Sequence, residues 1–194
     1  MPRLIAIAGG IGSGKSVVSR ILSVMGHPVY DCDSRAKMLM DSSAEIKRRV
    51  SDEISPSAVT SDGAIDRIKL ASVVFADKSR LEVLNSIVHG AVRRDIMDWA
   101  ESLDASVCWV ESAIVYESGI DRMVDEVWMV DAPEELRIDR VMSRNSMSRE
   151  AVKARIDAQA WPADRVPHPM TRILVNDGVA PLLPQILDLL ATVV

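Results

Sequence analysis

The sequence predicts an α/β fold with a central, mainly parallel sheet that is covered by helices. Two observations support this prediction. Short apolar runs of strand length alternate with helical segments along the chain, which is the pattern of parallel βα units. A glycine-rich segment at residues 9–16 joins the first apolar run to the first helical segment. The sequence contains no internal repeat or interdomain linker, so we expect residues 1–194 to form a single domain.

The first elements flank the glycine-rich segment. Residues 4–8, Leu-Ile-Ala-Ile-Ala, form an apolar run with the length of a buried strand. Residues 17–25 predict a helix because four apolar side chains share one face at helical spacing, namely Val18, Ile21, Leu22 and Met25. The segment 26–28, Gly-His-Pro, ends this helix, and a short strand is expected at 29–31.

The middle of the chain is mainly helical. The apolar spacing predicts helices at 34–40 and 44–50. Proline, serine and glycine then mark loops around a weakly patterned segment at 55–63. Residues 66–101 follow a helical pattern with a break near 76–78.

The last part of the chain returns to the alternation of strands and helices. Apolar runs at 107–110 and 126–130 predict two buried strands. Pro133 suits the first turn of a helix that runs to about residue 144, and a further helix is expected at 148–160. The closing elements are a strand and a helix, at 173–175 and 181–190.

The segment 9–16 reads Gly-Gly-Ile-Gly-Ser-Gly-Lys-Ser and has the spacing G-x-x-x-x-G-K-[ST] of a phosphate-binding loop. Glycines let backbone N–H groups converge on phosphate oxygens, and the following helix adds the positive end of its dipole. Lys15 can reach the β- and γ-phosphates of ATP, and the Ser16 hydroxyl can bind Mg²⁺. The residues expected to hold the nucleotide are Gly10, Ile11, Gly12, Ser13, Gly14, Lys15, Ser16 and Val17. The sequence therefore predicts a three-layer fold of the P-loop NTPase type.

Two aspartates follow the second predicted strand, at the sheet edge where open α/β sheets bind ligands. Asp31 and Asp33 are two residues apart, so on an extended backbone their side chains would point the same way. We expect Asp33 to take the proton of an attacking hydroxyl and Asp31 to help hold Mg²⁺ through water. The alternative for Asp33 is a role as the N-cap of the next helix.

Three arginines share one face of the helix that begins at Pro133, because Arg137, Arg140 and Arg144 stand at positions i, i+3 and i+7. Phosphoryl transfer requires positive charge around the migrating group, and guanidinium groups supply it in a planar fork. The alternative is a solvated helix face with ion pairs to neighbouring carboxylates.

Composition argues against several other classes of function. The net charge of −5 provides no general attraction to nucleic acid, and no apolar run approaches the roughly 18 residues of a membrane span. The two cysteines form no metal-binding or disulfide pattern. We therefore expect a cytoplasmic protein without nucleic-acid or membrane partners, as a monomer or a small homo-oligomer.

Over nearly its whole length the chain resembles the dephospho-CoA kinase family. The phosphate-binding loop and the segment Asp31-Cys32-Asp33 are the first two matches. The others follow in order along the chain: Asp62-Gly63-Ala64-Ile65-Asp66-Arg67, Leu70, Val74-Phe75, Leu84-Asn85-Ser86-Ile87-Val88-His89, Arg140, Arg144, Arg155-Ile156-Asp157-Ala158-Gln159 and Asn176.

The resemblance implies ATP-dependent phosphorylation of the ribose 3′-hydroxyl of dephospho-CoA, which is the last step of coenzyme A synthesis. It also implies a helical lid around residues 134–160 and a helical substrate-binding region. Asp33 would be the general base, Arg140 and Arg144 the charged groups of the lid, and Asn176 a neighbour of the adenine of ATP.

The acceptor is expected to contact Asp33, His89, Tyr116 and Glu117. For His89 the alternative is a structural role in its helix. Glu111 and Glu117 bracket a mainly apolar segment at the end of the third predicted strand, where a carboxylate can contact substrate or can be a solvated loop residue. Tyr116 and Glu117 belong to the segment 112–117, Ser-Ala-Ile-Val-Tyr-Glu, which departs from the Pro-Leu-Leu-Phe-Glu that is usual in the family.

Two other functions remain as alternatives. One is another small-molecule P-loop kinase that acts on a nucleoside monophosphate or a similar acceptor. The other is a nucleotide-binding regulator without transfer activity, although such a protein has no use for a general base or for lid arginines. A GTPase is disfavoured because the chain has no Asn-Lys-x-Asp segment to recognise guanine.

Overall fold

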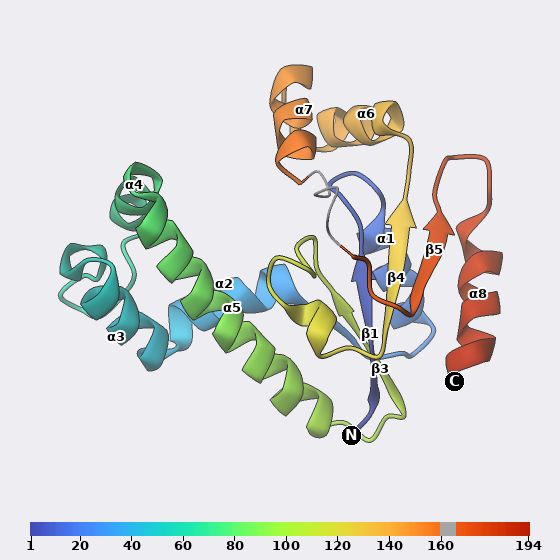
Figure 1. The fold of residues 1–194 in the computed structure, drawn as a ribbon, viewed down its shortest axis with the longest axis horizontal. Coiled ribbons are helices and arrows are strands. Elements are labelled where there is room, and N and C mark those ends of the chain that lie inside the picture. Colours follow the sequence, from blue (N-terminus) through green and yellow to red (C-terminus); the bar gives the residue numbers. More distant parts are fainter. Residues whose placement is uncertain (160–165) are drawn as a thin grey trace. The chain divides into compact units, whose positions relative to one another are not determined.

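The structure is a computed structural model that describes residues 1–159 and 166–194. The chain divides into two compact units, which can be followed by colour in Figure 1. The first unit comprises Met1–Tyr30 and Leu103–Val194 and contains most of the sheet, and the second comprises Asp31–Ser102. The organisation of the whole chain as a single domain stays a prediction.

The sheet has five strands in the order β2-β3-β1-β4-β5. β1 pairs in parallel with both β3 and β4, and β4 pairs in parallel with β5. The strands are β1 (Arg3–Ala8), β2 (Val29–Asp31), β3 (Val107–Glu111), β4 (Glu126–Asp131) and β5 (Thr171–Val175). The α/β class and the mainly parallel sheet are therefore confirmed, and each predicted strand is present within two residues of its expected ends.

Helices α1 (Lys15–Val24) and α8 (Leu182–Val193) pack on each other and against the sheet. Ile5 of β1 is in register with Trp109 of β3, and Ile7 is in register with Trp128 of β4. Because side chains alternate along a strand, these residues share the face on which α1 and α8 pack. The two indoles meet edge to face, with their ring centroids 5.9 Å apart.

One charged side chain is buried at the amino end of β4. Glu126 is only 1% exposed, and its carboxylate accepts hydrogen bonds from Arg3 Nη2 at 2.8 Å and from Trp128 Nε1 at 2.9 Å. Arg172 Nε lies 3.7 Å from the same carboxylate. A buried charge requires such partners, so the loss of one of them would leave the Glu126 carboxylate uncompensated at the amino end of β4.

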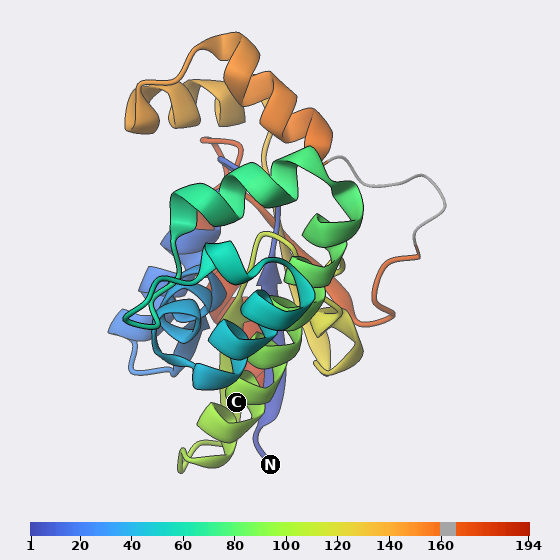
Figure 2. The ribbon, with the colours of Figure 1, turned by 90° about the vertical axis from the view of Figure 1, so that its left-hand side faces the viewer.

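A further pair of helices, α6 (Glu134–Asn145) and α7 (Arg149–Ala158), lies beyond the carboxyl end of the sheet. Figure 1 and Figure 2 show these helices in orange, packed on each other. Their buried side chains, Ile138, Val141, Val152 and Ile156, form a cluster of their own. This cluster is separate from the core of the sheet. The segment 134–160 that was expected to form the lid contains both helices, and residue 160 lies outside the described residues.

The second unit is helical. Its elements are α2 (Cys32–Ser42), α3 (Ala44–Glu53), the short 3₁₀ helix η1 (Pro56–Ala58), α4 (Arg67–Ala76) and α5 (Lys78–Glu101). The break predicted near 76–78 is confirmed, because Asp77 ends α4 and its side chain caps α5 by accepting from the N–H groups of Ser79 and Arg80. The long helix α5 contacts α2, α3 and α4.

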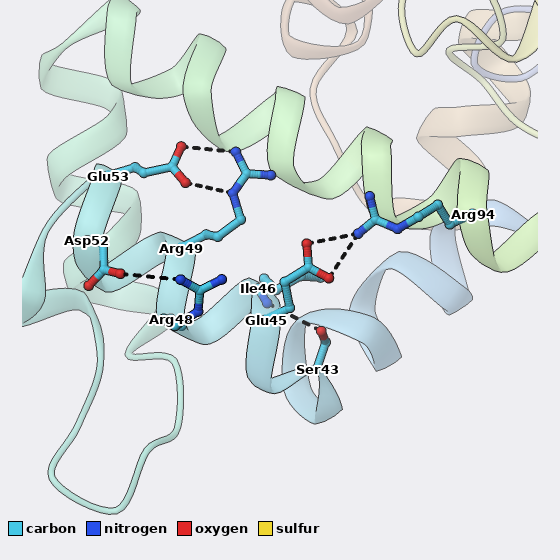
Figure 3. Close-up of polar contacts among 8 residues, drawn as sticks. All are labelled: Ser43, Glu45, Ile46, Arg48, Arg49, Asp52, Glu53 and Arg94. Carbon is cyan, nitrogen blue, oxygen red and sulfur yellow. Dashed lines mark hydrogen bonds and ion pairs between the residues drawn. The ribbon is translucent and has the colours of Figure 1, made fainter.

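Polar contacts connect α2 and α3 to α5, and those of α3 are drawn in Figure 3. Glu45 of α3 accepts two hydrogen bonds of 3.1 Å from Arg94 of α5, and Ser43 Oγ caps α3 by accepting from Ile46 N–H. Arg35 of α2 pairs with Asp95 of α5 through two bonds of 2.8 Å. Exposed ion pairs typically contribute under about 1 kcal/mol each to the free energy of unfolding. The unit is therefore stabilised mainly by its apolar cluster, which includes Ile46, Val50, Leu70, Val74 and Ile87.

Candidate active site

The phosphate-binding loop lies between β1 and α1, as the sequence predicted. Gly14 has φ 102° and a Cβ atom on it would overlap Nδ2 of Asn176, while a Cβ atom on Gly12 would lie 2.6 Å from the Arg137 carbonyl oxygen. Both positions therefore require glycine because the protein's own side chains and backbone pack closely on the outside of the loop. This is a second reason for the glycine spacing, besides the approach of phosphate oxygens.

The two residues expected to hold the phosphates and Mg²⁺ stand at the first turn of α1. Lys15 Nζ donates to the carbonyl oxygens of Gly9 at 2.8 Å and Gly10 at 3.2 Å, so its ammonium group lies against the loop. Ser16 is exposed at the same helix end. The positive end of the α1 dipole and the Lys15 charge thus act at one place, where an anion is favoured.

Asn176 links three segments at the loop. It directly follows β5, and its backbone N–H donates to Asp131 O at the end of β4, over 2.8 Å. Its Nδ2 donates to Ser13 O at 2.7 Å, and its Oδ1 accepts from Arg140 Nη2 at 3.3 Å. The expected neighbour of adenine therefore lies against the phosphate-binding loop, although its contact with adenine stays a prediction.

The arginines of α6 divide into two groups. Arg140 Nη1 lies 3.5 Å from Gly12 O, and Arg137 Nε donates to Ile11 O at 2.9 Å. Arg144 is exposed and donates to Asn145 Oδ1 at 2.9 Å. Arg137 was considered with the other two arginines as a source of positive charge, and the structure places its guanidinium group against the loop. The catalytic role of Arg144 stays a prediction.

The local structure around the two aspartates corrects one expectation. The prediction that Asp31 and Asp33 follow one extended backbone is wrong, because α2 begins at Cys32 and places Asp33 in its first turn. Asp31 is the N-cap: its carboxylate accepts from Asp33 N at 3.0 Å, Ser34 N at 3.2 Å and Ser34 Oγ at 2.6 Å. The capping role considered for Asp33 thus belongs to Asp31. The roles of Asp33 as base and Asp31 at Mg²⁺ stay predictions.

The sequence model of the dephospho-CoA kinase family matches residues 3–181. The chain belongs to the dephospho-CoA kinase family. The dephospho-CoA kinase of Porphyromonas gingivalis is 38% identical over 189 residues, which cover 97% of this chain and 93% of that relative. The dephospho-CoA kinase of Thermus thermophilus is 38% identical over 177 residues, covering 91% and 84%. The resemblance inferred from the motifs is confirmed, and the protein is a kinase.

Two solved structures share this fold. The crystal structure of TT1252 from Thermus thermophilus superimposes with a TM-score of 0.78 at 34% identity, covering 98% of this chain and 97% of that one. The dephospho-CoA kinase from Campylobacter jejuni has the same fold, with a TM-score of 0.63 at 24% identity over 98% and 96% of the two chains. These likenesses confirm the predicted fold class.

A further carboxylate lies at the end of β3, near the kinase loop. Glu111 ends β3 in register with Ile7 of β1, two residues before the loop begins at Gly9. It follows Trp109 by two residues, so its side chain is on the face on which α1 packs. Among the described residues the half-buried Glu111 carboxylate has no ion pair or hydrogen-bond partner. Its position at the end of an apolar strand is what made it a candidate for contact with the substrate, and that contact stays a prediction.

The other residues expected to bind the acceptor lie in different units. His89 is a half-buried residue of α5 in the helical unit. Tyr116 and the exposed Glu117 lie between β3 and β4 in the sheet unit, where the Tyr116 hydroxyl accepts from His168 N–H at 3.4 Å. Their contacts with the acceptor stay predictions.

Residues that could hold a metal are few. Within 1–159 and 166–194, no three His, Cys, Asp or Glu side chains converge in a way that could bind a metal ion. Mg²⁺ in kinases is usually held by one or two protein groups together with the substrate phosphates and water, so Ser16 and one carboxylate are a sufficient donor set.

Within the described residues, 1–159 and 166–194, no helix is long and apolar enough to cross a membrane.

Proposed function

We propose that the protein transfers the γ-phosphoryl group of ATP to the ribose 3′-hydroxyl of dephospho-CoA, giving coenzyme A and ADP. Membership of the dephospho-CoA kinase family is the observation that supports this function most strongly. The complete phosphate-binding loop supports it further, with Lys15 at its end and Arg140 and Asn176 against it.

The roles of the residues follow from the charge that develops during phosphoryl transfer. Asp33 accepts the proton as the 3′-oxygen attacks the γ-phosphorus, and the bond to the β-phosphate oxygen breaks to release ADP. Lys15, Arg140 and Arg144 stabilise the charge on the migrating group and on the leaving oxygen. The acceptor is oriented by His89, Tyr116 and Glu117.

The same proposal includes Mg²⁺. The ion would neutralise charge on the β- and γ-phosphates when bound, and the Ser16 hydroxyl would be one of its ligands. We expect the accompanying carboxylate to be Asp31, through water, or Glu111. Glu111 lies at the end of β3, one of the two strands adjacent to β1.

We further propose that the enzyme works in the cytoplasm as a monomer or a small homo-oligomer, without nucleic-acid or membrane partners. The net charge of −5 supports the absence of nucleic-acid binding. Light scattering coupled to gel filtration would measure the number of subunits.

The function is tested by measuring ADP release with ATP and Mg²⁺, in the presence and absence of dephospho-CoA. We expect kcat/KM for dephospho-CoA to exceed that for adenosine by at least about 100-fold, because the pantetheine arm provides binding energy that positions the 3′-hydroxyl. Adenosine, AMP and CMP serve as competing acceptors. Comparable rates on adenosine, or a preference for AMP or CMP, would assign the protein to another class of small-molecule kinase.

A further inference from the structure

We propose that the lid, defined as helices α6 and α7, holds the phosphate-binding loop in its binding conformation through one loop residue, Ile11. Arg137 and Gln159 are then positioning residues for phosphoryl transfer. The inference rests on the proposed nucleotide-binding function of the loop and adds a coupling between that site and the lid.

The backbone of Ile11 is held at both its N–H group and its carbonyl oxygen. Its N–H donates to Gln159 Oε1 at 2.8 Å, and its carbonyl oxygen accepts from Arg137 Nε at 2.9 Å. Arg137 belongs to α6, and Gln159 is the C-cap residue of α7. Each lid helix therefore contributes one hydrogen bond to the same loop residue.

The Ile11 side chain makes the apolar part of the connection. It packs against the cluster of Ile138, Val141, Val152 and Ile156 that α6 and α7 form between them. Of the described residues in this cluster and packed against it, Ile11 is the one that lies outside the segment 134–158. A loop residue thus completes the small core of the lid.

The close fit extends to the neighbours of Ile11. A Cβ atom on Gly10 would overlap Nη2 of Arg137, and one on Gly12 would lie 3.0 Å from Val141 Cγ2. The backbone from Gly10 to Gly12 is therefore packed directly against α6. If the lid moved away, the N–H and C=O groups of Ile11 would lose their protein partners and its side chain would lose its apolar contacts.

These contacts predict a reciprocal coupling. A nucleotide that fixes the loop also fixes the position of Ile11 and so favours the packed lid. Conversely, loosening the lid weakens nucleotide binding, and the factor by which each event affects the other is the same. Coupling factors in proteins are typically about 5- to 150-fold. We therefore expect the dissociation constant for ADP to rise about tenfold when either the hydrogen bond from Ile11 to Gln159 or the apolar contact of Ile11 is removed.

The test uses Gln159→Met, which keeps the length of the side chain but removes the acceptor, and Ile11→Ala, which removes most of the apolar contact. Ile11→Val is the conservative variant, expected to stay within about threefold of the wild type because it keeps a branched side chain in the cluster. The dissociation constant for ADP is measured by titration calorimetry, and hydrogen exchange is followed in residues 134–158 with and without ADP.

The matched controls come from the same unit. Gln185 Oε1 accepts from Val175 N–H and its Nε2 donates to Val175 O, so Gln185→Met removes comparable hydrogen bonds away from the loop. Ile186 is fully buried in the sheet core, so Ile186→Ala is a general destabilisation. Both controls should lower the melting temperature without weakening ADP binding or selectively increasing exchange in the lid.

We expect Gln159→Met and Ile11→Ala to weaken ADP binding about tenfold and to reduce the protection of the lid by ADP. Faster lid exchange with unchanged ADP affinity would overturn the inference, and so would weaker binding with unchanged lid exchange. Because no acceptor is present, a wild type that binds ADP but does not phosphorylate dephospho-CoA would contradict the proposed function and leave the coupling testable.

Discussion

Replacement of Asp31 separates its observed structural role from its expected role at Mg²⁺. The carboxylate accepts three hydrogen bonds, of 3.0, 3.2 and 2.6 Å, at the start of α2. Replacing an N-cap aspartate by alanine typically costs about 0.5–2 kcal/mol. Asp31→Asn keeps an acceptor for the backbone N–H groups and loses only the charge near the helix dipole, which contributes about 0.3–1 kcal/mol.

These magnitudes translate into melting temperatures. In a chain of this size a change of 1 kcal/mol in the free energy of unfolding shifts the melting temperature by about 2–4 °C. We therefore expect Asp31→Ala to melt about 1–8 °C below the wild type, and Asp31→Asn to melt nearer to it. Thermal unfolding followed by circular dichroism measures both shifts.

The Mg²⁺ dependence of turnover provides the second measurement. If Asp31 also helps to hold the ion, Asp31→Asn should raise the Mg²⁺ concentration for half-maximal rate while stability is largely kept. If Asp31→Ala had the same melting temperature as the wild type, the capping argument would be refuted. An unchanged Mg²⁺ dependence in Asp31→Asn would remove Asp31 from the metal site, and Glu111→Gln would then be expected to raise the Mg²⁺ requirement instead.

Three further outcomes follow from the site and its supporting helices. Lys15→Ala should abolish most turnover while the melting temperature stays near that of the wild type, and substantial residual turnover would contradict the assignment of Lys15 to the phosphates. Asp33→Asn should lower kcat by about 10²- to 10⁴-fold with little change in ATP affinity, as for the loss of a general base; unchanged kcat would exclude that role. The hydrogen bond from the Ser79 hydroxyl, followed by backbone N–H bonds, lowers the pKa of Asp77 below its ordinary value of 3.8. Its contribution to stability is therefore present above pH 3.8 and is lost as the pH falls through the lowered pKa. The difference in unfolding free energy between wild type and Asp77→Asn should thus shrink in acid.

The strand and helix patterns were largely readable from the chain because they depend on local periodicity. The apolar runs at 4–8, 107–110 and 126–130 predicted strands that the sheet contains, and the break near 76–78 separates α4 from α5. The error at Asp31 was also local. An aspartate followed by a short polar segment can end a strand or cap a helix, and the sequence spacing alone did not decide between these conformations.

The sequence by itself determined the phosphate-binding loop, since one contiguous segment contains the glycines, the lysine and the serine that its chemistry requires. Only the tertiary structure decided which distant side chains reach that loop. Arg137, Gln159 and Asn176 are 126 or more residues away from their loop partners along the chain. Their positions depend on how α6, α7 and β5 pack around the carboxyl end of the sheet, and helical spacing specifies a face of a helix but not what that face contacts.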